Sequence, residues 1–193
     1  MKVIAGTVAV LALVAAVQPA AAQSVSGTVT LEGTVGDKCI VTDGGATPNI
    51  DFGGTIDLGE LDDTDGTLRS IGTISASSNL DNLGFRVVCT TALPRVEITA
   101  EPMVNPTGVA TGGYANAVHF TADTKFSLVS GGTQTFGVTT NGTPINGGHL
   151  SARLATGEHN VQIDLSNFHT LGSADVLTAG DYTGTVSITI SPI

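Results

Sequence analysis

The sequence has no tryptophan, only two tyrosines and few basic residues, and these shortages weigh against several classes of function. Sugar-binding modules usually present Trp or Tyr rings to the sugar, and Tyr114 and Tyr182 leave little material for such a platform. Seven Lys and Arg stand against seventeen Asp and Glu, a net charge of −10. This charge argues against nucleic acid as a partner, because affinity for it comes mainly from Lys and Arg that neutralise phosphates. An anionic membrane surface is disfavoured for the same reason.

Motifs that carry chemistry are also lacking. There is no Gly-x-Ser-x-Gly elbow, no phosphate-binding glycine loop with a lysine and no evident carboxylate pair. The acidic stretch Asp57–Gly66 fails the EF-hand test, because Leu61 would take the first ligand position and Gly72 the place of the bidentate Glu. A solvated loop is the favoured interpretation, with an irregular calcium site as the alternative. Four histidines show no metal-ligand spacing: His119, His149, His159 and His169. We therefore expect no enzyme, no metal, no cofactor and no small-molecule substrate.

A long apolar run occurs only at the start of the chain. Residues 1–22 have the features of a secretory signal peptide: Lys2 supplies positive charge, Val3–Val17 is too short to span a bilayer comfortably, and Ala20–Ala22 offers a cleavage site. We expect an exported protein whose mature chain starts near Gln23. It would keep 171 residues, enough for one domain with a core, and a formal charge of −11.

Only two cysteines are present, Cys39 and Cys89. In an exported chain they most simply form one disulfide. A metal pair or a reactive thiol would be the alternative, but there is no Cys-x-x-Cys spacing and no histidine close to either cysteine in the sequence. A disulfide would close a loop of about fifty residues, worth roughly 4 kcal/mol in the chain-entropy model.

The sequence is rich in a period of two, in which apolar and polar residues alternate, and it has no helical period of useful length. Many short strands separated by turn residues predict an all-β fold, an antiparallel sandwich. The predicted strands are Val25–Val35, Cys39–Val41, Ile50–Gly54, Leu68–Ser75, Gly84–Cys89, Val96–Ala100, Ala117–Phe120, Lys125–Val129, Thr133–Val138, Leu150–Leu154, Asn160–Leu165 and Tyr182–Ile190.

Glycine and asparagine mark the predicted turns. Gly131–Gly132 indicates a hairpin, and Asn141–Gly142 and Gly147–Gly148 bracket another turn region. Met103–Gly113 is predicted to be a loop because it holds a proline and three glycines, and Asn167–Gly180 is predicted to be irregular.

The first predicted strand, Val25–Val35, is unusual in its position. It lies near the expected mature N-terminus, with no earlier element to pair with and no turn that folds it back. We interpret it as a strand meant for another molecule; the alternative is an ordinary first strand that pairs within its own domain. Its apolar face consists of Val25, Gly27, Val29, Leu31, Gly33 and Val35.

Several motifs follow one another in a recognisable order. They are Gly33-Thr-Val-Gly-Asp-Lys-Cys39, Ile50-Asp-Phe-Gly53, Phe85-Arg-Val-Val-Cys-Thr-Thr91 and Ala179-Gly-Asp-Tyr-Thr-Gly-Thr-Val-Ser-Ile-Thr-Ile190. Together they resemble chaperone-usher pilin subunits, in particular the archaic branch that shares the spore coat protein U domain. The resemblance covers nearly all of the expected mature chain. The chain departs from many members at its end, where Pro192 and Ile193 replace an aromatic residue.

The resemblance implies an immunoglobulin-like antiparallel sandwich that is incomplete and is completed by a donor strand from a neighbouring subunit. Residues 23–36 would be the donor extension and residues 37–193 the pilin domain. The implied partners are copies of the chain itself, a periplasmic chaperone and an outer-membrane usher. The product would be exported through the periplasm to an extracellular, cell-surface fimbria.

The same resemblance assigns roles to individual residues. Val29, Leu31 and Val35 would fill pockets of the neighbour's groove, while Gly27 or Gly33 would mark close backbone approach. A Cys39–Cys89 disulfide would join early strands. The last strand would line the groove through Tyr182, Val186, Ile188 and Ile190.

A second class of function stays open beside the pilin. A monomeric, secreted β-sandwich could bind a carbohydrate or another surface ligand. The two differ in association state, because a binding module should be a stable monomer, whereas a pilin should polymerise or need a chaperone.

Overall fold

The computed structural model describes residues 28–42, 53–75, 84–157 and 159–193, and every regular element within these ranges is a β-strand. The predictions for the signal peptide, for Val25 and Gly27, and for 50–52 lie outside the described residues. The strands are β1 (Cys39–Val41), β2 (Ile74–Ser75), β3 (Gly84–Phe85), β4 (Val87–Cys89), β5 (Arg95–Val104), β6 (Tyr114–Ala115), β7 (Ala117–Ser127), β8 (Thr133–Thr139), β9 (Ile145–His149), β10 (Val161–His169), β11 (Val176–Leu177) and β12 (Thr183–Ser191).

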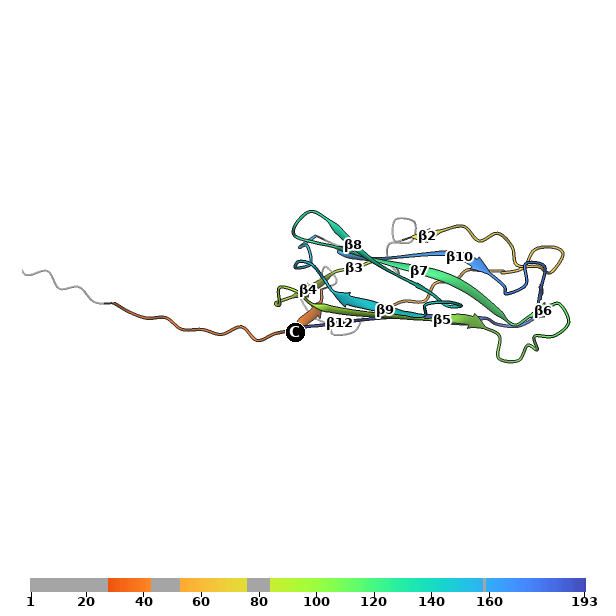
Figure 1. The fold of residues 1–193 in the computed structure, drawn as a ribbon, viewed down its shortest axis with the longest axis horizontal. Helices are drawn as coiled ribbons and strands as arrows, with labels where there is room; N and C mark the ends of the chain where they lie inside the picture. Colours follow the sequence, from red (N-terminus) through yellow and green to blue (C-terminus); the bar gives the residue numbers. More distant parts are fainter. Residues whose placement is uncertain (1–27, 43–52, 76–83, 158) are drawn as a thin grey trace, which may run out of the picture. The chain divides into compact units, whose positions relative to one another are not determined.

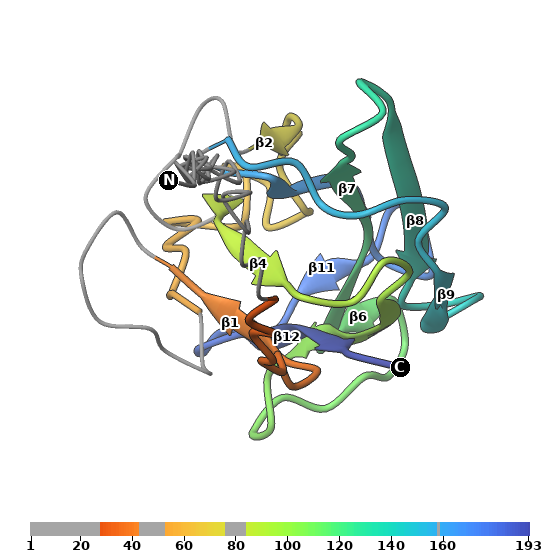
Figure 2. The ribbon, with the colours of Figure 1, turned by 90° about the vertical axis from the view of Figure 1, so that its left-hand side faces the viewer.

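Eight of these strands form one sheet in the order β12-β5-β7-β10-β2, with β8 beside β7, β9 beside β5 and β3 beside β10 (Figure 1). All of its pairings are antiparallel. A separate antiparallel pair joins β1 to β4, and a short parallel pair joins β6 to β11. In the view of Figure 2, β1 and β4 lie on the opposite side from β8 and β9. The all-β, mainly antiparallel prediction is confirmed.

The core is built by alternate residues of the long strands. Along β7, every second side chain from Val118 to Phe126 is buried, and β5 contributes Val96, Ile98 and Ala100 in the same manner. Phe126 meets Phe136 of β8 edge to face, with ring centroids 6.0 Å apart. The period of two in the sequence therefore identified the inward faces of these strands. Val35–Ile193 forms one compact unit.

Two predicted strands, Ala117–Phe120 and Lys125–Val129, turn out to be one strand, β7. The sequence pattern predicts turn residues between them. Instead, Ala122 and Thr124 point into the core with no exposed surface, and Asp123 is paired on both sides, with Gly137 and Asp164. The strand continues through this stretch because β8 and β10 pair with it on both sides.

The turn region that Asn141–Gly142 and Gly147–Gly148 are predicted to bracket is shorter than expected, because Gly147 and Gly148 belong to β9, opposite Glu97 and Val96 of β5. A β-carbon at Gly147 would clash with the Val96 carbonyl oxygen, so the close approach of the two backbones requires glycine there. Asn141–Gly142 does lie in the turn that precedes β9.

Five other stretches differ from the prediction. Only the last two residues of Leu68–Ser75 form a strand, and Leu150–Leu154 makes a single bridge, from Leu154 to Leu128. Gly84–Cys89 divides at Arg86, because β3 pairs with β10 and β4 pairs with β1. β5 ends at Val104, inside the predicted Met103–Gly113 loop. β10 and β11 also take up parts of Asn167–Gly180.

No helix in the described ranges is long and apolar enough to cross a membrane.

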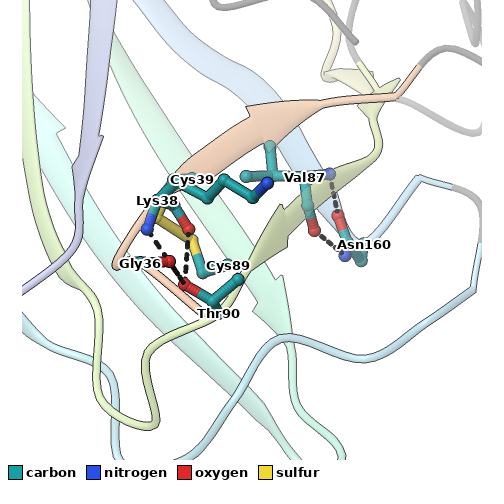
Figure 3. Close-up of a disulfide and its surroundings, with 7 residues drawn as sticks. All are labelled: Gly36, Lys38, Cys39, Val87, Cys89, Thr90 and Asn160. Carbon is teal, nitrogen blue, oxygen red and sulfur yellow. Dashed lines mark hydrogen bonds between the residues drawn. A yellow bond between two sulfur atoms is a disulfide. The ribbon is translucent and has the colours of Figure 1, made fainter. Parts of the chain in front are cut away.

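A buried asparagine secures β4 to the main sheet. The Asn160 side chain is 1% exposed; its Nδ2 donates to the carbonyl oxygens of Val87 and Ala155, each at 2.7 Å. Its Oδ1 accepts from the Val87 N–H at 2.8 Å. One amide thus supplies Val87 with the two bonds that a neighbouring strand would otherwise give it (Figure 3).

Replacing Asn160 with alanine should lower the free energy of unfolding by about 3 kcal/mol, because it leaves buried backbone groups without partners. Urea denaturation of the purified protein would measure the change. Asn141→Ala, at an exposed asparagine, is the control and should cost less than about 1 kcal/mol. A loss below that level for Asn160→Ala would contradict the role given to this side chain.

Candidate functional site

The last strand, β12, lies at one end of the main sheet. Its ladder partner is β5, and no other described strand pairs with it. The predicted alternation is present, since Val186, Ile188 and Ile190 face the core and Ser187 and Thr189 face solvent. These apolar side chains are only half-buried, unlike their counterparts on β5 and β7. An apolar strand at a free edge is a template for another strand.

A groove of about 600 Å³ follows this edge. Seven consecutive residues of the chain, Tyr182–Ile188, line it. Because both the inward and the outward residues of β12 take part, the groove runs along the strand's backbone edge and not only over one face. Its other apolar lining residues are Ile56, Leu58, Phe85, Met103, Phe120, Ile163, Leu165 and Phe168.

Deeper residues of the groove belong to the core. Phe120, Ile163 and Leu165 are at most 9% exposed, and Phe168 packs against Phe120 with ring centroids 5.8 Å apart. The groove lining contains no carboxylate, histidine, cysteine, lysine or arginine among the described residues, and Tyr182 is its one titratable group. The groove therefore suits an uncharged, apolar guest.

A second segment, residues 53–58, also contributes to the groove, although it is far from β12 in the sequence. No described backbone hydrogen bond places it in a sheet. Its side chains nevertheless alternate, with Ile56 and Leu58 half-buried and Thr55 and Asp57 exposed. This pattern is typical of a strand that packs on a core through one face. The predicted strand Ile50–Gly54 stops short of Ile56 because the acidic stretch begins at Asp57, although the spacing of Ile56 and Leu58 is a signal of a buried strand face.

The predicted lining of the last strand is found in part at this groove. Tyr182, Val186 and Ile188 line it, whereas Ile190 packs against the core beyond the lining residues. The Tyr182 hydroxyl lies 2.9 Å from the Thr178 carbonyl oxygen and 3.1 Å from that of Ala115, and it donates its one proton to one of them at a time, so it holds the entry into β12. Gly184 lies at a bulge in the β12–β5 ladder, where a β-carbon would press on the Met103 backbone.

The N-terminal arm, by which we mean residues 23–35, is described from residue 28 onward. It has no strand assignment in the single chain. Its apolar residues are exposed: Val29 by 84%, Leu31 by 91% and Val35 by 79%. Three large apolar side chains on one face of an extended segment are costly to leave in water, at about 1.5 to 3 kcal/mol each. Gly33, on the same face, has open space where a β-carbon would lie.

Cys39 and Cys89 form a disulfide, as the sequence predicts, and they are direct partners in the β1–β4 ladder. The bond lies immediately after Gly36–Lys38, which we call the root of the arm (Figure 3). The position at which the arm leaves β1 is therefore covalently attached to β4.

Several carboxylates of the acidic stretch Asp57–Gly66 accept hydrogen bonds from within the stretch or from the adjacent Thr67. Asp65 Oδ1 accepts from the Thr67 hydroxyl at 2.7 Å and from the Thr67 N–H at 3.0 Å, and these bonds lower the pKa of Asp65. Asp57 accepts from the Gly59 N–H. Within the described part of the chain, no three His, Cys, Asp or Glu side chains are grouped to hold a metal ion.

Two of the four histidines are brought together on the outer face of the groove-bearing strands. His119 of β7 and His169 of β10 are ladder partners, with ring centroids 5.8 Å apart. A bulge at Asn167, which has a positive φ of 54°, sets this register and turns Phe168 into the groove. Burial, and secondarily the charge of His169, lower the pKa of His119.

This shift predicts that acid weakens the fold. Below the ordinary histidine pKa of 6.5, the unfolded chain takes up a proton that His119 resists in the folded state, so the free energy of unfolding falls as pH falls. His119→Gln, which keeps a partner for Thr140, should flatten this dependence between pH 7 and pH 5. Thermal or urea unfolding at several pH values would measure it. Equal slopes for the variant and the parent protein would contradict the prediction.

Comparison with known protein families, with curated proteins and with solved structures finds no match to this chain. Two features of the chain bear on its function. One is the apolar groove along the unpaired edge of β12, and the other is the exposed, alternating arm.

Proposed function

We propose that this chain is the structural subunit of an extracellular pilus or fimbria that polymerises by donor-strand exchange. The observation that carries the proposal is the groove along the free edge of β12. Such a groove lacks one strand, and the arm has the composition of that strand. The chain is thus suited both to receive a strand and to donate one.

The chemistry of the two parts agrees. The groove lining is apolar and uncharged, and the arm presents Val29, Leu31 and Val35 on one face and threonines on the other. A strand added along β12 would complete its backbone hydrogen bonds, while alternate side chains enter the groove. Segment 53–58 would offer the added strand a second neighbour. With the added strand, the chain would form the donor-strand-completed, immunoglobulin-like sandwich that the motif order implies.

A head-to-tail contact of this kind does not close on itself, so it produces a filament. Until a neighbour arrives, the groove exposes apolar surface and an unpaired sheet edge, both of which promote aggregation. A periplasmic chaperone that fills the groove, followed by exchange at an outer-membrane usher, would protect it. Export and the disulfide are compatible, because disulfides persist in oxidising compartments.

The proposal predicts opposite outcomes for two neighbouring residues of the arm. Leu31→Asp should reduce fibre formation at least tenfold, because it would place a charge in an apolar groove. Thr30→Asp adds the same charge on the polar face and should assemble nearly as the parent protein does. Negative-stain microscopy and sedimentation of the assembled material would count the fibres.

Two results would count against the proposal. One is fibre formation by Leu31→Asp at the level of Thr30→Asp. The other is a parent protein that stays a stable monomer at every concentration and without a chaperone, which would favour the secreted binding module instead.

A further inference from the structure

Thr90, the residue after the disulfide, makes an unusual set of bonds to the root of the arm. Its N–H donates to the Lys38 carbonyl oxygen at 2.9 Å, and its Oγ1 accepts from the Lys38 N–H at 2.9 Å. The same Oγ1 lies 3.1 Å from the Gly36 carbonyl oxygen and 3.3 Å from that of Lys38. A hydroxyl has one proton, so it donates to one of these carbonyls at a time, and Gly36 offers the shorter bond. Figure 3 shows Thr90 against both residues.

These bonds are not a simple continuation of the β1–β4 ladder. The register Cys39↔Cys89 makes Lys38 and Thr90 the next pair, and a regular ladder would join the Lys38 N–H to the Thr90 carbonyl. Here the Thr90 side chain takes the place of that carbonyl. The backbone therefore leaves the ladder at this point, and the Thr90 side chain holds Gly36 and Lys38 by hydrogen bonds.

A chain that carries both a groove and the strand that fits it faces an internal competitor. Its own arm is tethered, so its effective concentration at its own groove can reach the millimolar range unless geometry prevents insertion. A neighbouring subunit is favoured in this competition when the groove is already occupied, as by a chaperone, or when the tether is restrained from returning. The root is a place where such a restraint can act without changing the arm or the groove.

We infer that Thr90 is a positioning residue, which restrains the root of the arm and so disfavours insertion of the arm into its own groove. The inference rests on the proposed function, because it concerns which copy of the groove the arm enters. Thr90 is not a groove-lining residue, and its side-chain hydrogen bonds go to Gly36 and Lys38. Its effect is on the choice between self-insertion and exchange.

The first test asks whether the restraint at the root exists. Lys38 is the one basic residue in 23–38, and trypsin needs the peptide after it in an extended, accessible form. Thr90→Val removes the hydroxyl but keeps the branched shape, so release of the N-terminal peptide should become several-fold faster. Thr90→Ser keeps the hydroxyl and should be cleaved at the parent rate. Equal rates for Thr90→Val and the parent protein would overturn the inference.

The second test asks whether the restraint selects the partner. The full mature chain is refolded at a series of concentrations, and its size is followed by chromatography with light scattering. Self-insertion is independent of concentration, whereas exchange is not. Thr90→Val should yield several-fold more closed monomer, in a proportion that dilution does not change, and fewer fibres than the parent protein or Thr90→Ser.

The two proposals fail in different ways. If Thr90→Val assembles as the parent protein does, the role of Thr90 is refuted and the pilus subunit stands. If the parent protein forms no concentration-dependent polymer, the proposed function is refuted, and the inference about Thr90 with it.

Discussion

Backbone N–H and C=O groups on the outer edge of β12 have no strand partner among the described residues, and the strand's apolar side chains are only half-covered. Unpaired backbone groups can hydrogen-bond to water, whereas apolar side chains are stabilised by removal from water. At the edge of β12 these two preferences oppose each other. A guest that brings both a backbone edge and alternate apolar side chains resolves the conflict. The groove, its uncharged lining and segment 53–58 all lie beside this unpaired edge.

The arm shows the same conflict in a simpler form. An extended segment with exposed Val29, Leu31 and Val35 has no core of its own to enter, and an isolated strand has no stability in water. The unpaired, half-covered edge of β12 and the exposed apolar face of the arm occur on the same chain, and together they are more informative than either is alone. They favour our proposal of an assembling subunit over a self-contained binding module, with a further copy of the same chain as the proposed partner.

Local pattern predicted the strand faces well, because alternation reports directly on which side chains turn inward, as in β5 and β12. It failed where the neighbour decides the structure. Gly147 and Gly148 look like a turn until β5 approaches them, and Ala122 and Thr124 look like a break until β8 and β10 flank them. The last strand's part in the site was predicted, but the deeper groove was not, since Phe120, Ile163 and Phe168 meet only through sheet topology.

The disulfide has one further effect on the groove. Cys39 and Cys89 are 50 positions apart, and segment 53–58 lies within the loop that they close. Both ends of this loop are thus anchored at one point of the β1–β4 pair. The covalent bond therefore limits how far this side of the groove can move away from the β1–β4 pair.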